Sequence, residues 1–251
     1  MTNTKIIKNI KEHFKNRESF LRDELYNFYK QFDPELNERT FGWRIFDLKK
    51  KNIINSVAKG IYTLSTKQIF KPQIDDKLLK INKILTTDFH DIKYCLWDTS
   101  WLHEFMIHQP VQKDFIVEAE AEIAESVFYK LKDNGIKDIF FAPHKNGINV
   151  YLMENMENVF IKIMLSRSPI QKIKKIKIAP LEKILVDIFT EEKFFGAYQG
   201  RELINIFENA VKKYIINFSK MFNYARRKRR EKELKEFTAK HFPQLLKEYL
   251  Q

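Results

Sequence analysis

Apolar side chains recur at helical spacing at the start of the chain and predict three short helices. The segments 4–15 and 19–33 each carry an apolar residue at about every fourth position, and Ser19 is a residue type that caps helices. Pro34 should end the second helix, because the residue before a proline disfavours helical backbone angles. Asn37 has the residue type expected at the N-cap of a third helix.

The third predicted helix has one apolar face and one polar, aromatic face. Phe41, Ile45 and Leu48 fall within a stripe about 100° wide, so they should point into a core. The opposite face carries Arg39, Trp43 and Lys50, flanked by Thr40 and Phe46. Arginine is the side chain that most often reads guanine in a major groove, so this face is a candidate for DNA recognition.

Two β-branched runs follow, Ile53–Val57 and Ile61–Leu64, and the Lys59-Gly60 turn between them predicts a hairpin. Three helices and then a hairpin is the order of a winged helix-turn-helix, in which the third helix enters the major groove and nearby lysines contact phosphates. The sequence therefore predicts a DNA-binding domain over residues 1–65. The DNA contacts expected there are Arg39, Thr40, Trp43, Arg44, Lys49, Lys50, Lys51 and Lys59.

Residues 73–251 follow a polar junction and predict a mixed α/β domain with a helical C-terminal end, so the expected fold class is α+β. Helices are expected over 74–86, from 119 to a stop at Gly135, over 181–189, and as one long helix from Leu203 to Phe222. Beyond Tyr224 a charged tail keeps a thin apolar stripe. The expected strands are Tyr94–Trp97, Phe115–Val117, Ile139–Phe141, Ile148–Leu152, Phe160–Leu165 and Ile173–Ile178.

The composition excludes several classes of protein. Hydrophobic residues make up 44% of the chain and aromatic residues 14%, which is enough for a buried core and argues against disorder. The single cysteine, Cys95, excludes an intrachain disulfide and every cysteine-cluster metal site, and within an apolar strand it should be inert core. No apolar run approaches the length of a membrane span, and the start lacks a signal-peptide core. A cytoplasmic protein without membrane contact is expected.

The net charge of +12 is unevenly distributed. Residues 1–65 carry +5, residues 66–165 carry −3 and residues 166–251 carry +10. Basic patches attract polyanions, although charge alone names no partner. The densest cluster is Arg226, Arg227, Lys228, Arg229 and Arg230, which predicts a phosphate clamp on DNA or RNA; the alternative is a solvated helix with the pairs Arg227–Glu231 and Arg229–Glu233.

Several phrases together resemble the AbiE-type abortive-infection antitoxins, within an AbiEi-like branch. They are the winged-helix start, YCLWDTSWLHEFMIHQP, FIVEAEAEIAESVFYKLKDNG, IAPLEKILVDIF and YARR, and they span almost the whole chain. The resemblance implies a winged helix that binds operator DNA and represses its own operon. It also implies a C-terminal domain that neutralises a nucleotidyltransferase toxin, with no chemistry and no cofactor of its own. The tail RRKRREKELKEFTAKHFPQLLKEYL is longer and more basic than that family's pattern.

Two alternatives from other classes stay open. The winged helix could serve only protein interaction, with Trp43 and Phe46 facing a partner. A restriction-endonuclease-like nuclease would use Asp98 and Glu118, but Glu120 stands where such enzymes place a lysine.

His103 and His108 are five residues apart, which is not the spacing of a helical zinc site, so no metal site is expected. The aromatic run Trp97, Trp101 and Phe105 is interpreted as core rather than as a binding strip.

Overall fold

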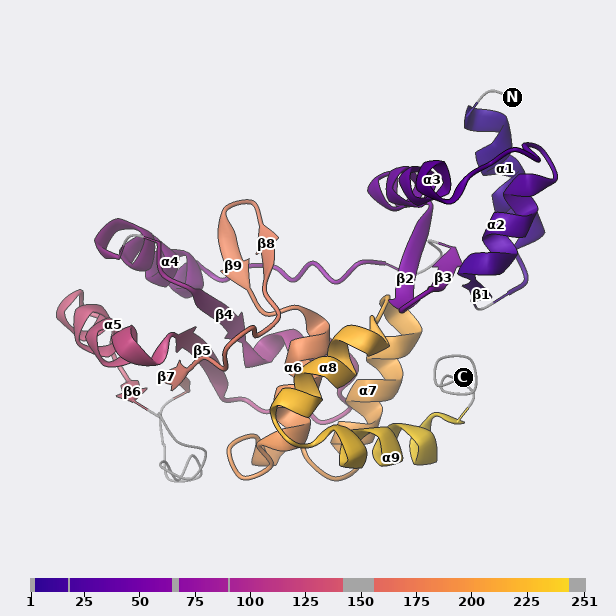
Figure 1. Cartoon of the computed structure of the whole chain (residues 1–251). Coiled ribbons are helices and arrows are strands. Elements are labelled where there is room, and N and C mark those ends of the chain that lie inside the picture. The colour runs from indigo at the N-terminus through magenta and orange to yellow at the C-terminus, as the bar shows by residue number, and fades with distance from the viewer. Residues whose placement is uncertain (1–2, 18, 65–67, 90, 142–155, 244–251) are drawn as a thin grey trace.

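The computed structural model describes residues 3–17, 19–64, 68–89, 91–141 and 156–243. An N-terminal unit is joined by an extended segment to a larger C-terminal unit (Figure 1). The predicted fold class is confirmed, because a mixed sheet is followed by helices at the C-terminal end. In the described ranges no helix combines the length and the apolar character needed to cross a membrane. The predicted strand Ile148–Leu152 lies outside the described residues.

The N-terminal unit contains the predicted three helices and hairpin, and one strand that was not predicted. Phe20 and Leu21 pair with β3 opposite Tyr62 and Ile61, so α2 begins at Arg22 and not directly after Ser19. This strand depends on a partner that is distant in sequence, which local pattern cannot reveal. The elements are α1 (Asn3–His13), β1 (Phe20–Leu21), α2 (Arg22–Lys30), α3 (Glu38–Lys50), β2 (Ile54–Ala58) and β3 (Ile61–Leu64).

The position of α3 is fixed by its cap and by its apolar face. The Asn37 side chain accepts a hydrogen bond from the Thr40 backbone N–H at 2.9 Å, which confirms the predicted N-cap. Phe41, Ile45 and Leu48 are buried in the core of the unit, as predicted. The opposite face of α3 is therefore turned outward.

The C-terminal unit is built on a six-stranded sheet in the order β6-β7-β5-β4-β9-β8. Its strands are β4 (Tyr94–Asp98), β5 (Lys113–Ala119), β6 (Ile139–Phe141), β7 (Glu157–Ile163), β8 (Gln171–Ile173) and β9 (Ile176–Ile178). Its longer helices are α4 (Asp76–Asp88), α5 (Ala121–Asp133), α6 (Leu181–Thr190), α7 (Arg201–Lys213), α8 (Phe218–Arg227) and α9 (Glu231–His241), with short 3₁₀ turns at Thr99–Phe105 and Gly196–Tyr198. Cys95, Trp97, Trp101 and Phe105 are buried in this unit, so their interpretation as core is confirmed.

Helices cover both faces of the sheet. On one face, the Tyr94 hydroxyl donates to Asn82 of α4 at 2.6 Å. On the other, Glu118 of β5 meets Lys183 of α6. Every residue of α6 is buried, because the sheet lies on one side of it and α7 and α8 lie on others (Figure 1).

Two predicted elements are divided in the structure. The long helix expected from Leu203 to Phe222 is broken between α7 and α8, where Ile215 N–H donates to the Gln68 carbonyl at 3.0 Å and Asn217 caps α8. The strand expected over Ile173–Ile178 is a hairpin, in which Ile173 pairs with Ile176 and Lys174 adopts a φ of +55°.

Candidate functional site

The outward face of α3 is an exposed surface with cations and aromatic rings. Arg39, Thr40 and Lys50 are exposed, and Trp43 and Phe46 keep 66% and 57% of their surface accessible. The two rings contact each other edge to face, with centroids 5.9 Å apart. Arg39 and Lys50 make no ion pair with the described part of the chain. This surface, called the α3 face below, consists of these five residues.

Three other predicted DNA contacts near α3 are engaged within the unit. Arg44 pairs with Asp33 at 2.6 Å and lies over the Tyr29 ring. Lys51 pairs with Asp47 at 2.7 Å. The Lys49 ammonium lies 4.9 Å from the centre of the Tyr62 ring, and burial lowers the pKa of Lys49. We therefore expect Arg39 and Lys50, rather than these three residues, to be available for a ligand.

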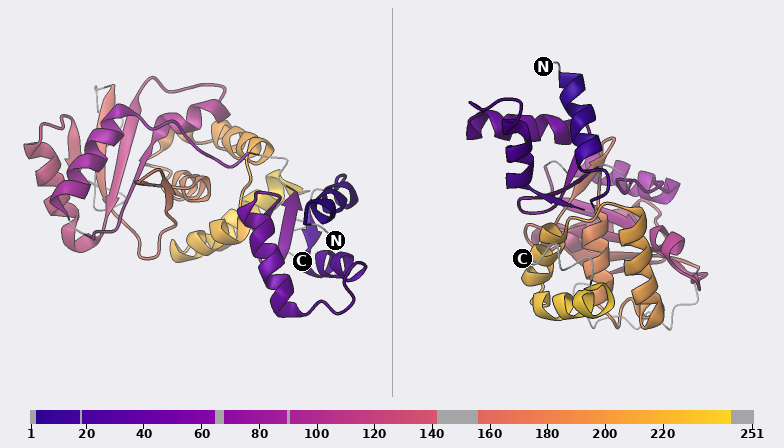
Figure 2. Two further views of the ribbon diagram at one scale, coloured as in Figure 1. Left: turned by 90° about the horizontal axis from the view of Figure 1, so that it is seen from above. Right: turned by 90° about the vertical axis from the view of Figure 1, so that its right-hand side faces the viewer.

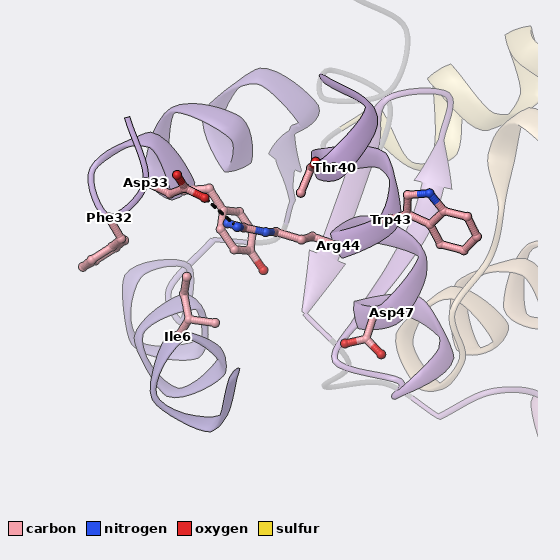
Figure 3. Close-up of a pocket in the computed structure, with 8 residues that line it drawn as sticks. Ile6, Phe32, Asp33, Thr40, Trp43, Arg44 and Asp47 are labelled. Carbon is pink, nitrogen blue, oxygen red and sulfur yellow. Dashed lines mark hydrogen bonds and ion pairs between the residues drawn. The ribbon is translucent and has the colours of Figure 1, made fainter. Parts of the chain in front are cut away.

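A groove of about 470 Å³ lies beside α3 and is crossed by the Arg44–Asp33 pair (Figure 3). Its lining contains two carboxylates and one guanidinium, so its charge does not favour a polyanion. Burial raises the pKa of Tyr29 to about 12, so its hydroxyl stays neutral. The lining residues are Ile6, Tyr29, Phe32, Asp33, Thr40, Trp43, Arg44 and Asp47.

The turn of the β2–β3 hairpin is docked against the C-terminal unit. The Lys59 backbone N–H donates to the Ser219 hydroxyl of α8 at 3.0 Å. Val57, Ala58 and Ile61 form a small apolar cluster with Ile215. The side chain of Lys59 is exposed, but the backbone of its turn is held by α8 and does not extend freely as a wing.

The basic stretch Arg226–Arg230 does not form the predicted clamp on one helix. The helix α8 ends at Arg227, and the backbone turns at Arg229, which has a φ of +60°. The Lys228 ammonium is buried against Asp187 and Glu191, which corrects its assignment as a phosphate contact. The pairs Arg227–Glu231 and Arg229–Glu233 are replaced by Arg226–Glu231 and Arg230–Glu233, since the turn shifts the register.

The structure does not bring this basic stretch next to the α3 face. Ser219 at the start of α8 contacts the β2–β3 turn. Arg226 and Arg227 lie at the other end of α8, which is ten residues long. A helix of that length extends about 15 Å. Of the remaining cations, Arg227 donates to the carbonyl and hydroxyl of Ser166 at 2.8 and 2.7 Å, while Arg230 pairs with Glu192 and Glu233.

A buried charge cluster lies between the sheet, α6 and α8. The Lys183 ammonium donates to Glu118 at 2.6 Å, to Asp187 at 2.5 Å and to the Tyr224 hydroxyl at 3.0 Å. Burial opposes ionisation of Asp187, but the neighbouring ammonium groups outweigh it and hold the pKa of Asp187 well below its usual value. The cluster consists of Glu118, Lys162, Lys183, Asp187, Glu191, Tyr224 and Lys228.

Sequence reasoning did not identify this cluster, although a signal was present. The phrase IAPLEKILVDIF places Lys183 and Asp187 four residues apart within a helix that is otherwise largely apolar. A lysine and an aspartate at that spacing lie on the same side of a helix, and in a buried helix each needs a partner.

The two carboxylates that a nuclease would use point to opposite faces of the sheet. Asp98 of β4 pairs with Phe115 of β5, and Cys95 of β4 pairs with Glu118 of β5, so the two side chains of each pair lie on the same face of the sheet. Side chains alternate along a strand, so residues three apart face opposite ways. Glu120 pairs with Lys93 at the surface. In the part of the chain that the structure describes, no three histidine, cysteine or acidic side chains are grouped so that they could hold a metal ion.

A hollow of about 410 Å³ lies near Asp98, but its charges are already paired. The Lys113 ammonium lies 2.7 Å from Asp75 and 3.1 Å from Asp98. Glu104, also in the lining, pairs with Lys213 and accepts from the Tyr214 hydroxyl. Burial raises the pKa of Asp98, and hydrogen bonding to Ser100 offsets only part of this rise. The hollow thus offers one cation and three acids that neutralise one another in part.

DNA or RNA incubated with the full chain and Mg²⁺ or Mn²⁺ should remain intact, because Asp98 and Glu118 cannot converge on one ion. Gel electrophoresis of end-labelled duplex and single strands measures this. Cleavage that is lost in both Asp98→Ala and Glu118→Ala would contradict the expectation and favour the nuclease.

A comparison with curated proteins found no match to the chain. Residues 40–244 match the model of a family of unknown function, DUF6577. The match begins within α3 and extends through the sheet and the C-terminal helices as far as α9. The chain therefore belongs to the DUF6577 family.

Proposed function

We propose that the chain is a sequence-specific DNA-binding regulator whose helix α3 lies in the major groove. The observation that carries this proposal is the α3 face, which leaves Arg39 and Lys50 exposed opposite the buried Phe41, Ile45 and Leu48. The order of helices and strands around it, with a three-stranded sheet, is the order of a winged helix and supports the same proposal.

Each side chain of the α3 face has a role in this proposal. Arg39 reads guanine through O6 and N7, and Thr40 contacts a base or a phosphate. Lys50 contacts phosphate and sets the position of the helix rather than the sequence that is read. Trp43 and Phe46 supply apolar contacts, for which the thymine methyl group is suited.

The biological setting rests on the resemblance to AbiE-type antitoxins. A protein of that type acts in the cytoplasm, represses its own operon and binds a nucleotidyltransferase toxin. The larger C-terminal unit, with its own core, is the part that would contact the toxin. No chemistry and no cofactor belong to this proposal.

A second candidate function is protein binding through the α3 face. It is favoured by the exposure of two large aromatic rings, Trp43 and Phe46, side by side on one helix. Aromatic residues are enriched at the centres of protein interfaces. The two candidates differ in their dependence on salt, since DNA binding releases counterions and a largely apolar interface does not.

The test is selection of binding sites from a random pool of duplex DNA by the full-length chain. We expect enrichment of a defined sequence, and a log affinity that falls linearly with log salt, with a slope of about −0.9 for each phosphate neutralised. Fluorescence anisotropy with the selected duplex measures that slope. Failure to retain any duplex at low salt would contradict the proposal and leave protein binding as the better reading of the α3 face.

A further inference from the structure

The β8–β9 hairpin divides its residues between the core and solvent. Ile176 and Ile178 are buried, and Ile173 packs against the same core. Lys172, Lys174 and Lys175 are exposed. The hairpin lies at the edge of the sheet, where β9 joins β4 through the pair Leu96–Ile178.

The exposed lysines of this hairpin are not used by the rest of the described chain. The side chains of Lys172, Lys174 and Lys175 have no ion pair or hydrogen bond with the residues that the structure describes. Lys177 differs, because its ammonium donates to the Ile92 carbonyl at 2.7 Å and lies over the Tyr94 ring. Lys177 anchors the base of the hairpin, while the other three charges face water.

The hairpin stands on the side of the molecule where α3 lies. In Figure 1 it projects upward from the C-terminal unit toward the level of α3, and the segment that joins the two units crosses the hairpin in this view and passes below α3. The view from above in Figure 2 shows the N-terminal unit to one side of the C-terminal unit. Lys71 of the joining segment is also exposed. A polyanion bound to the α3 face would therefore have the exposed lysines of the hairpin and Lys71 to one side of it.

The other hairpin is less suited to this role. The β2–β3 turn is held against α8 by the Lys59–Ser219 hydrogen bond, and Val57 and Ile61 beside it contact Ile215 in the segment before α8. A winged helix usually places this turn against the DNA backbone, but here its backbone is engaged. The β8–β9 turn carries no such contact among the described residues.

From these observations we infer that the β8–β9 hairpin is a second DNA-binding element, in which Lys172, Lys174 and Lys175 contact phosphates of the duplex bound by α3. The inference rests on the proposed function. Phosphate contacts carry no sequence information, so the hairpin contributes affinity and orientation while α3 reads the sequence.

The experiment compares two triple variants of the full-length chain on the selected duplex. The first is Lys172→Ala with Lys174→Ala and Lys175→Ala. The matched control is Arg226→Ala with Arg229→Ala and Lys232→Ala, which removes three exposed cations from the far end of α8, from the turn after it and from α9. Circular dichroism melting checks that both variants fold.

For the hairpin variant, we expect the salt slope to become shallower by about 2.7, which is three phosphate contacts at about 0.9 each. Its selected sequence should be unchanged, and the control should keep the slope of the parent. An unchanged slope in the hairpin variant would overturn the inference and identify these lysines as charges that protect a sheet edge from aggregation. An equal loss in both variants would overturn it as well.

The two proposals fail in different ways. If the parent chain binds no duplex, the proposed function itself is wrong. If the parent binds with a steep salt slope and the hairpin variant has the same slope, only the role of the hairpin is wrong. A shallower slope in the control alone would assign the phosphate contacts to the basic stretch instead.

Discussion

Replacing Arg39 with alanine is expected to weaken binding to the selected duplex by about 1–3 kcal/mol, the usual contribution of one bidentate arginine–guanine contact. Arg39 is exposed, makes no ion pair with the described residues and lies opposite the buried face of α3, so the fold should not change. The measurement is the affinity for the selected duplex and for duplexes with single base changes, at one fixed salt concentration. The preference at one base position should be relaxed in the variant.

Lys50→Ala is the matched control for this prediction, because Lys50 lies on the same face of α3. It should weaken binding to all duplexes about equally and make the salt slope shallower by about 0.9, as expected for a phosphate contact. If Arg39→Ala binds the selected duplex as tightly as the parent does, Arg39 does not read the sequence. If Arg39→Ala weakens the affinity for all duplexes equally, Arg39 contacts phosphate rather than a base.

The N-terminal unit shows how much local pattern can predict. The cap at Asn37, the buried stripe of Phe41, Ile45 and Leu48, and the turn at Gly60 are all decided by residues near one another in sequence, and each is confirmed. The strand at Phe20 was missed because its only reason to be extended is its partner Tyr62. The outward direction of Arg39 follows from the buried stripe, so this part of the candidate site could be predicted.

The C-terminal unit shows where pattern is insufficient. The run Ile173–Ile178 was interpreted as one strand, although the adjacent Lys174 and Lys175 break its alternation at the position of the turn. A single break in a six-residue run is too short a signal to separate one strand from two. The cations of Arg226–Arg230 are alike in sequence, but the end of α8 sends Lys228 inward and leaves Arg229 outside. Which charge is buried depends on the distant carboxylates of Asp187 and Glu191.

The two units are coupled through α8. Its first turn holds the β2–β3 hairpin, and its Tyr224 hydroxyl donates to Asp187 of α6 at 2.9 Å. The buried charge cluster therefore fixes the helix that in turn holds the N-terminal unit. A change in the cluster should be felt first as a loss of stability of the C-terminal unit.

Lys183→Met is expected to destabilise the protein by about 3–5 kcal/mol, the usual cost of removing one partner from a buried ion pair. Methionine replaces much of the volume of lysine, so the cost comes mainly from Glu118 and Asp187, which lose their shared ammonium in a site where Lys183 has no exposed surface. Urea unfolding at pH 7, followed by circular dichroism, measures the free energy of unfolding.

The dependence of this loss on pH separates charge from packing. Burial raises the pKa of Glu118 even with Lys183 present, and without Lys183 that pKa should rise further. A carboxyl group whose pKa is higher in the folded state than in the unfolded chain lowers the free energy of unfolding at a pH above its folded-state pKa, where it is ionised. This destabilisation is lost as the pH falls and the carboxyl group binds a proton. The difference in the free energy of unfolding between Lys183→Met and the parent should therefore shrink as the pH falls from 7 toward about 4, the ordinary range of carboxyl groups.

Adding Glu118→Gln to Lys183→Met removes the unpaired charge, so the double variant should recover part of the loss at pH 7. A loss that is the same at pH 7 and pH 5, and unchanged in the double variant, would mean that Lys183 acts through packing rather than through its charge.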